Sequence, residues 1–163
     1  MSRYRNQNQI TTLVIHCADT PNGKYFDARD IDAWHKERSF KRSPELIGYH
    51  MPHLHHIGYH FVIRTTGALD NGRKLTETGA HVGGHNSYTI GTCLIGRDKY
   101  THQQWHMLKA HVEAIKRAIP TLKHIKGHRE FDAGKTCPGF DVQAWLAGGM
   151  EPLEGHILEQ GEN

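Results

Sequence analysis

The chain has 163 residues, of which 37% are hydrophobic and 23% are charged. One domain commonly takes roughly 100 to 200 residues and disordered chains are poorer in apolar residues, so these values exclude two large domains and a disordered chain. The formal net charge is +3 without a basic arm, and we therefore expect no nucleic-acid partner.

The N-terminal end shows no secretory signal. Residues 1–9 are polar, and nowhere does the chain contain about 18 consecutive apolar residues. The three cysteines cannot all pair with one another, which argues against a disulfide framework. We expect a monomer that is made in the cytoplasm without a signal peptide and has no membrane partner.

The first half of the chain predicts a strand, a helix and a β-hairpin. Residues 11–18 are almost continuously apolar and rich in β-branched side chains, which is typical of a strand buried on both faces. Asp27 is a candidate N-cap for a helix over residues 28–39. Residues 41–57 contain two prolines, one glycine and four histidines, which indicates a loop. Residues 61–75 contain two extended runs around a glycine turn and predict the hairpin.

The second half predicts two further strands and two helices. Residues 89–96 have a strand pattern. Residues 101–119 begin with a Thr-x-x-Gln capping box and then repeat apolar residues at helical spacing. Residues 122–127 predict a short strand, and residues 141–146 predict a short helix.

Helices that alternate with strands predict a single α/β domain with a central mixed β-sheet flanked by helices. We expect this domain to span residues 1–148. Residues 149–163 contain four glutamates together with glycine and proline, which predicts an acidic, flexible tail.

Histidine is unusually frequent, with 15 copies, and this excess points to metal binding. His16 ends the first strand, His128 follows the last strand, and Cys137 lies nine residues later in a Pro-Gly loop. Zinc prefers imidazole nitrogen and thiolate sulfur, and a catalytic zinc keeps one position for water beside three protein ligands. Spacing alone does not select these three residues, since no CxxC or HExxH motif is present. The histidines between His50 and His60 could hold a second metal ion. The other interpretation is that they belong to a solvated loop without a metal.

Seven segments, in the same order, resemble those of the zinc-dependent N-acetylmuramoyl-L-alanine amidases, a family that includes phage lysozymes and the peptidoglycan recognition proteins. The segments are residues 13–17, 31–35, 57–63, 79–86, 90–91, 127–130 and 135–141. The resemblance implies an amidase catalytic domain over residues 1–148, with the zinc site at one end of the sheet. It also implies peptidoglycan as the partner and hydrolysis of the amide bond between N-acetylmuramic acid and L-alanine.

The resemblance further implies roles for individual residues. His16, His128 and Cys137 match the family's ligands for one Zn²⁺ ion, with water as the fourth. Tyr59 matches the catalytic tyrosine, and Lys135 matches the lysine that helps to polarise the scissile carbonyl.

Three further residues match the family's substrate groove: His35 on the first helix, and His81 and Asn86 in a glycine-rich loop. The chain departs from the phage-type enzymes in its longer stretch before Tyr59, where an extra Ile-Gly-Tyr-His copy makes Tyr49 a rival for the catalytic tyrosine. We favour Tyr59 because a strand follows it directly. One extra residue before Lys135 is easily absorbed by a loop.

These features leave four hypotheses on function. One is a zinc hydrolase that acts on a different amide or on a peptide bond. The favoured one is a phage or prophage endolysin that acts on the cell wall after release from the cytoplasm. A cytosolic amidase that recycles muropeptides has the same chemistry. A peptidoglycan-binding module without catalysis is disfavoured, because Cys137 and Lys135 are both present.

Overall fold

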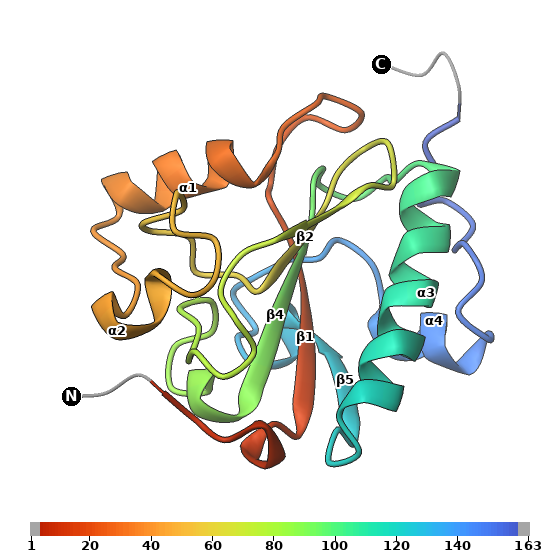
Figure 1. Cartoon of the computed structure of the whole chain (residues 1–163). Helices are drawn as coiled ribbons and strands as arrows, with labels where there is room; N and C mark the ends of the chain where they lie inside the picture. The colour runs from red at the N-terminus through yellow and green to blue at the C-terminus, as the bar shows by residue number, and fades with distance from the viewer. Residues whose placement is uncertain (1–3, 160–163) are drawn as a thin grey trace.

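The structure is a computed structural model that describes residues 4–159. In this range the chain forms a five-stranded mixed sheet of order β3-β2-β4-β1-β5 (Figure 1). The strands are β1 (Thr12–Cys17), β2 (Phe61–Ile63), β3 (Leu69–Asn71), β4 (Thr89–Leu94) and β5 (His124–Gly127). The helices are α1 (Ala28–Glu37), α2 (Pro44–Ile47), α3 (His102–Ala118) and α4 (Val142–Ala147), with 3₁₀ turns η1 (Gln7–Gln9), η2 (Asn86–Tyr88) and η3 (His128–Glu130). The predicted α/β domain with a mixed sheet is confirmed.

Strands β1 and β4 form the centre of the sheet. They run parallel to each other, and every residue of both strands is buried, as the apolar pattern of each predicts. β5 pairs in parallel with the other side of β1, and β2 pairs in parallel with β4. β2 and β3 pair antiparallel and form the predicted hairpin.

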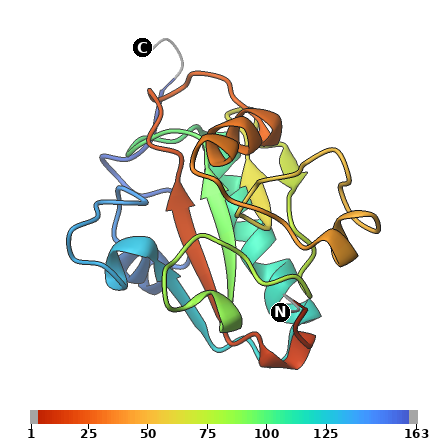
Figure 2. The same cartoon turned by 90° about the vertical axis from the view of Figure 1, so that its left-hand side faces the viewer.

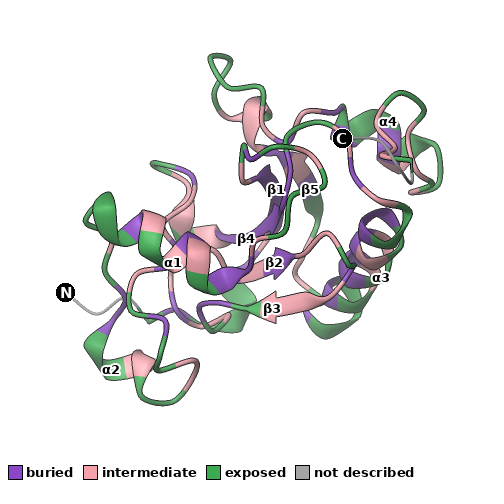
Figure 3. Ribbon diagram, turned by 90° about the horizontal axis from the view of Figure 1, so that it is seen from above, coloured by how far each residue is buried: buried purple, intermediate pink, exposed green. Residues whose placement is uncertain are grey.

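The two faces of the sheet carry different layers. α3 and α4 cover one face, and α1 lies on the opposite side (Figures 1 and 2). Because side chains of a strand alternate between faces, Leu13, Ile15 and Cys17 join the apolar cluster under α3 and α4. His16 therefore points to the other face, where α1 packs. Seen from above, the buried strands lie between α1 and α3 (Figure 3).

Both long helices begin where their capping residues predict. The Thr101 hydroxyl accepts from the Gln104 N–H at 3.1 Å, and the Gln104 side chain accepts from the Thr101 N–H at 3.0 Å, so the capping box opens α3. The Asp27 carboxylate accepts from the N–H groups of Arg29 and Asp30 at the start of α1. Such an N-cap typically contributes about 1 kcal/mol. No helix among residues 4–159 is long and apolar enough to span a bilayer.

The segment over residues 41–57 contains the short helix α2 and is held by a buried ion pair. Arg42 and Glu77 have fully buried side chains and lie 2.9 Å apart. Arg42 also donates to the backbone carbonyls of His50, Met51 and Leu54. Buried charges require such partners, and this network fixes the segment beside the residues that follow the hairpin.

The predicted acidic tail is packed over its described part. The Tyr100 N–H donates to the His156 carbonyl, and the Leu158 N–H donates to the Tyr100 carbonyl. Leu153 and Ile157 contact the apolar cluster under α3. The composition of this segment predicts a flexible tail. It carries no information on contacts with residues far away in the chain, such as those before α3. Residues 160–163 of the predicted tail lie outside the described residues.

Candidate active site

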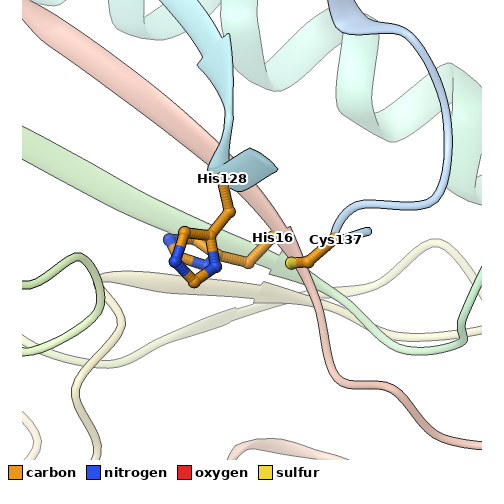
Figure 4. A group of neighbouring side chains, drawn as sticks. All are labelled: His16, His128 and Cys137. Carbon is orange, nitrogen blue, oxygen red and sulfur yellow. The ribbon is translucent and has the colours of Figure 1, made fainter. Parts of the chain in front are cut away.

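The three candidate metal ligands converge at one end of the sheet. His16 lies near the end of β1, and His128 follows β5 directly. Because β1 and β5 are parallel neighbours, their carboxyl ends meet, and the two imidazole rings lie 4.6 Å apart between centroids. Cys137 approaches from the loop before α4 (Figure 4). One ligand atom of each residue lies within 4.8 Å of the others, and no other such group of three was found within residues 4–159.

The chemistry of these three side chains suits a metal cation. Burial lowers the pKa of His16 well below its usual value, and burial together with the Lys135 charge lowers the pKa of His128. Both imidazoles are therefore neutral near pH 7, which is the form that binds metals. The Cys137 Sγ accepts a hydrogen bond from the Cys17 N–H at 2.9 Å. Two imidazole nitrogens and one sulfur are a donor set that zinc prefers.

Tyr59 lies beside this group, just before β2. Its ring centroid is 5.0 Å from that of His16 and 5.2 Å from that of His35. Burial raises the pKa of Tyr59 well above its usual value, so the phenol stays protonated and can donate. Tyr49, the rival tyrosine, is 83% exposed and is not brought to this group.

A groove of about 410 Å³ opens in front of the candidate ligands. Six of the residues singled out from the sequence line it, namely His35, Tyr59, His81, Asn86, His128 and Lys135. Arg38, Phe40 and Asp132 also line it and were not anticipated. The Arg38 guanidinium lies 4.6 Å above the Phe40 ring. Arg38 follows α1 directly and Phe40 comes two residues later, but nothing in their sequence pattern indicates that they line the groove.

His35 ties α1 to the segment that carries Tyr59. Its Nδ1 accepts from the Gly58 N–H at 2.8 Å, and its side chain is buried with Ile31 on one face of α1. A side chain at Gly58 would collide with the Ala80 carbonyl oxygen, so this close approach requires glycine.

His81 and Asn86 belong to the loop on the other side of the groove. The Asn86 side-chain oxygen accepts from the N–H groups of His81 and Val82 at 3.0 and 2.9 Å, which closes the loop. The His81 Nδ1 lies 2.9 Å from the His16 Nε2. Both residues therefore line the groove, and His81 also contacts the candidate metal ligand His16 from within the protein.

Lys135 lies in the loop between His128 and Cys137, with its side chain exposed at the groove. Two backbone hydrogen bonds shape this loop, from Arg129 N–H to the Cys137 carbonyl and from Lys135 N–H to the Asp132 carbonyl.

Comparison with known proteins gives one family. The family model described as N-acetylmuramoyl-L-alanine amidase matches residues 6–140. An endolysin of Enterobacteria phage K11 is 28% identical over 155 residues, which cover 90% of this chain and 92% of the relative. The endolysin of Escherichia phage T7 is 27% identical over 150 residues, covering 88% and 89%.

Solved structures share the fold. The amidase LysC from Clostridium intestinale URNW superposes with a TM-score of 0.70 at 23% identity, covering 93% of each chain. Bumblebee PGRP-SA superposes with a TM-score of 0.69 at 20% identity, covering 94% of this chain and 89% of the other.

Proposed function

The chain belongs to the N-acetylmuramoyl-L-alanine amidase family, and we propose that it cleaves peptidoglycan at a single zinc ion held by His16, His128 and Cys137. As a peptidoglycan amidase, it hydrolyses an amide bond of the cell wall. The bond is the one that joins the lactyl group of N-acetylmuramic acid to the L-alanine of the stem peptide.

The observation that carries this proposal is the convergence of three distant parts of the chain. Residues 16, 128 and 137 come from two strand ends and one loop, and their ligand atoms lie within 4.8 Å of one another. Tyr59 and Lys135 border the same groove. This combination of donors and polar groups supports hydrolysis rather than binding alone.

The protein groups would act on the scissile carbonyl. When bound, zinc lowers the pKa of its water to about 7 and polarises the carbonyl. The Tyr59 hydroxyl, kept protonated by burial, donates a hydrogen bond to the carbonyl oxygen as negative charge develops on it. The Lys135 ammonium stabilises the same charge from the exposed side of the groove. One such donor is typically worth about 2.7 to 4 kcal/mol.

The groove suits the substrate in charge as well. Arg38 and Lys135 provide two cations along its walls, against one carboxylate from Asp132. The stem peptide of peptidoglycan carries carboxylates, which such cations attract. His35 supports the segment of Tyr59 through Gly58, so we assign it a part in shaping the groove.

For the biological setting, we propose an endolysin that reaches the cell wall after release from the cytoplasm. Relatives named endolysins match this chain over about nine-tenths of both lengths, with 90% and 92% for the phage K11 protein. The alternative is an amidase that recycles soluble wall fragments.

Metal analysis and substrate preference test this proposal. Purified protein should retain one zinc ion per chain, and it should digest intact peptidoglycan faster than soluble anhydro-muropeptides. A protein that binds no zinc would overturn the metal site. A strong preference for the soluble fragments would instead assign the chain to recycling.

A further inference from the structure

Two imidazoles meet behind the candidate metal site. The His16 Nε2 lies 2.9 Å from the His81 Nδ1, with the two rings edge-on at 84°. A neutral imidazole carries one proton, so this contact is a hydrogen bond only if one ring donates and the other accepts. The contacts beyond His81 decide which ring donates.

The direction is set by a backbone carbonyl. The Thr89 hydroxyl lies 2.9 Å from the His85 carbonyl oxygen, which can only accept, so the hydroxyl donates to it. The same hydroxyl oxygen lies 3.3 Å from the His81 Nε2. With its own proton already used, the hydroxyl must accept here, and the proton therefore sits on the His81 Nε2.

The tautomer of His81 in turn determines the tautomer of His16. A neutral His81 with its proton on Nε2 has a free lone pair on Nδ1, which accepts from the His16 Nε2–H. His16 in turn has its proton on Nε2 and a free lone pair on Nδ1. That nitrogen is the one left to bind a metal.

The position of the His81 ring is fixed by two glycines. A Cβ at Gly91 would lie 2.6 Å from the His81 Cγ, and a Cβ at Gly79 would lie 2.7 Å from its Cδ2. Asn86 holds the His81 backbone from the other side. Thr89 is fully buried, so water does not compete for its hydroxyl. The ring therefore occupies space that a side chain at Gly79 or Gly91 would fill.

We infer that Thr89 and His81 are positioning residues that fix the tautomer of His16 and so make its Nδ1 the metal-binding nitrogen. This inference rests on the proposed metal site and adds the direction of the hydrogen bonds behind it. A metal-bound histidine usually donates to a carboxylate, a backbone carbonyl or water. Here the partner is a neutral histidine, and a threonine relays the bond to a backbone carbonyl, so no extra negative charge is placed behind the ligand.

A matched pair of variants at Thr89 provides the first test. Thr89→Val keeps the shape of the side chain but removes the hydroxyl, whereas Thr89→Ser keeps the hydroxyl. The zinc dissociation constant is measured by competition with a chromophoric chelator. Thr89→Val should weaken zinc binding about tenfold, at the lower end of the 10- to 100-fold typical for loss of an outer partner, and Thr89→Ser should remain near the wild type. Equal zinc affinity in the wild type and Thr89→Val would overturn the inference.

A second pair of variants tests whether the position of the His81 ring matters, without altering any hydrogen-bonding side chain. Gly91→Ala displaces the His81 ring and should also weaken zinc binding. Gly48→Ala is the control, because a Cβ at Gly48 meets nothing within 4 Å. An unchanged zinc affinity in Gly91→Ala would contradict the inference, because zinc binding would then not depend on the position of the His81 ring.

Ring-nitrogen NMR of the metal-free wild type completes the test, even if the variants fold poorly. Long-range ¹H–¹⁵N spectra should show protons on Nε2 of both His16 and His81. A proton on the His16 Nδ1 would overturn the inference while leaving the proposed zinc site intact. Failure of the wild type to bind zinc would instead overturn the proposed function, and the tautomers would still be readable.

Discussion

The backbone N–H of Cys17 donates to the Sγ of Cys137 across 2.9 Å, between residues that are 120 positions apart in the chain. This backbone hydrogen bond favours the ionised sulfur, whereas the Cys17 side chain and burial together hold the pKa of Cys137 above its usual value in the metal-free protein. Since Cys17 follows His16 directly, the end of β1 presents one candidate ligand and holds another. The two thus keep their relative position through a single rigid strand.

Replacing Cys137 by serine should remove zinc and activity together, because a serine hydroxyl does not supply the thiolate that zinc prefers. The loss of zinc affinity should exceed the roughly 10- to 100-fold that removal of an outer partner costs. Metal analysis and peptidoglycan digestion measure the two effects. His55→Ala, in the exposed part of the histidine-rich segment, is the control and should change neither. A Cys137→Ser protein with normal zinc content would remove Cys137 from the site.

Replacing Tyr59 by phenylalanine should lower kcat by about 10²- to 10³-fold, the usual cost of one donor to a developing oxyanion. Zinc content should stay at the wild-type level, because the hydroxyl is not proposed as a ligand. Tyr49→Phe is the matched control, since Tyr49 is 83% exposed. If Tyr49→Phe lost activity and Tyr59→Phe did not, the two tyrosines would have to exchange roles.

Replacing Lys135 by methionine should lower kcat by a similar factor with zinc retained, because the cation acts on the scissile carbonyl. The same variant should raise the pKa of His128 in the metal-free protein, since the Lys135 charge contributes to lowering it. Kinetics and an NMR titration measure the two effects. Lys123→Met, exposed and outside the groove, serves as the control. Unchanged kinetics in Lys135→Met would exclude the lysine from catalysis.

Much of this site could be predicted from the sequence, because its elements follow local rules. The apolar run before His16 and the capping box of α3 both depend on neighbouring residues. Strand ends then mark where side chains of parallel strands meet, which places His16 near His128. The resemblance to the amidase family selected Cys137 from the remaining candidates, which spacing alone did not do.

The other features depend on contacts between residues far apart in the chain. The segment over residues 41–57 is held by the buried pair of Arg42 and Glu77, and no local pattern predicts that pairing. The contacts of His156 and Ile157 near the start of α3 are likewise not predicted by the sequence of this short acidic segment. The support of His16 by His81 requires the open space at Gly91, which is recognisable only once both strands are in place.

Stability should fall as the pH decreases below 6.5. Burial lowers the pKa of His35 to about 4, of His60 to about 3 and of His111 to about 4. Between about pH 6.5 and 4 the unfolded chain binds these protons and the folded protein does not, so acid favours unfolding. Each group contributes up to about 1.4 kcal/mol per pH unit in that window. Urea unfolding of the metal-free protein at several pH values measures the slope.

His111→Gln isolates one of these groups, because His111 lies on α3 under the sheet, away from the groove. It should reduce the pH slope by the share of one proton. His106→Gln, on the exposed side of the same helix, should leave the slope unchanged. Equal slopes in His111→Gln and the wild type would mean that His111 does not stay neutral when buried.

The position of the cleaved bond distinguishes a peptidoglycan amidase from every other wall hydrolase. Purified peptidoglycan is digested with the zinc-loaded protein, and the soluble products are identified by mass spectrometry with labelling of new amines. We expect intact stem peptides that begin with a free L-alanine amine, together with glycan strands whose N-acetylmuramic acid carries a free lactyl carboxylate. Fragments cut within the stem peptide or within the glycan, with the lactyl amide still intact, would contradict it.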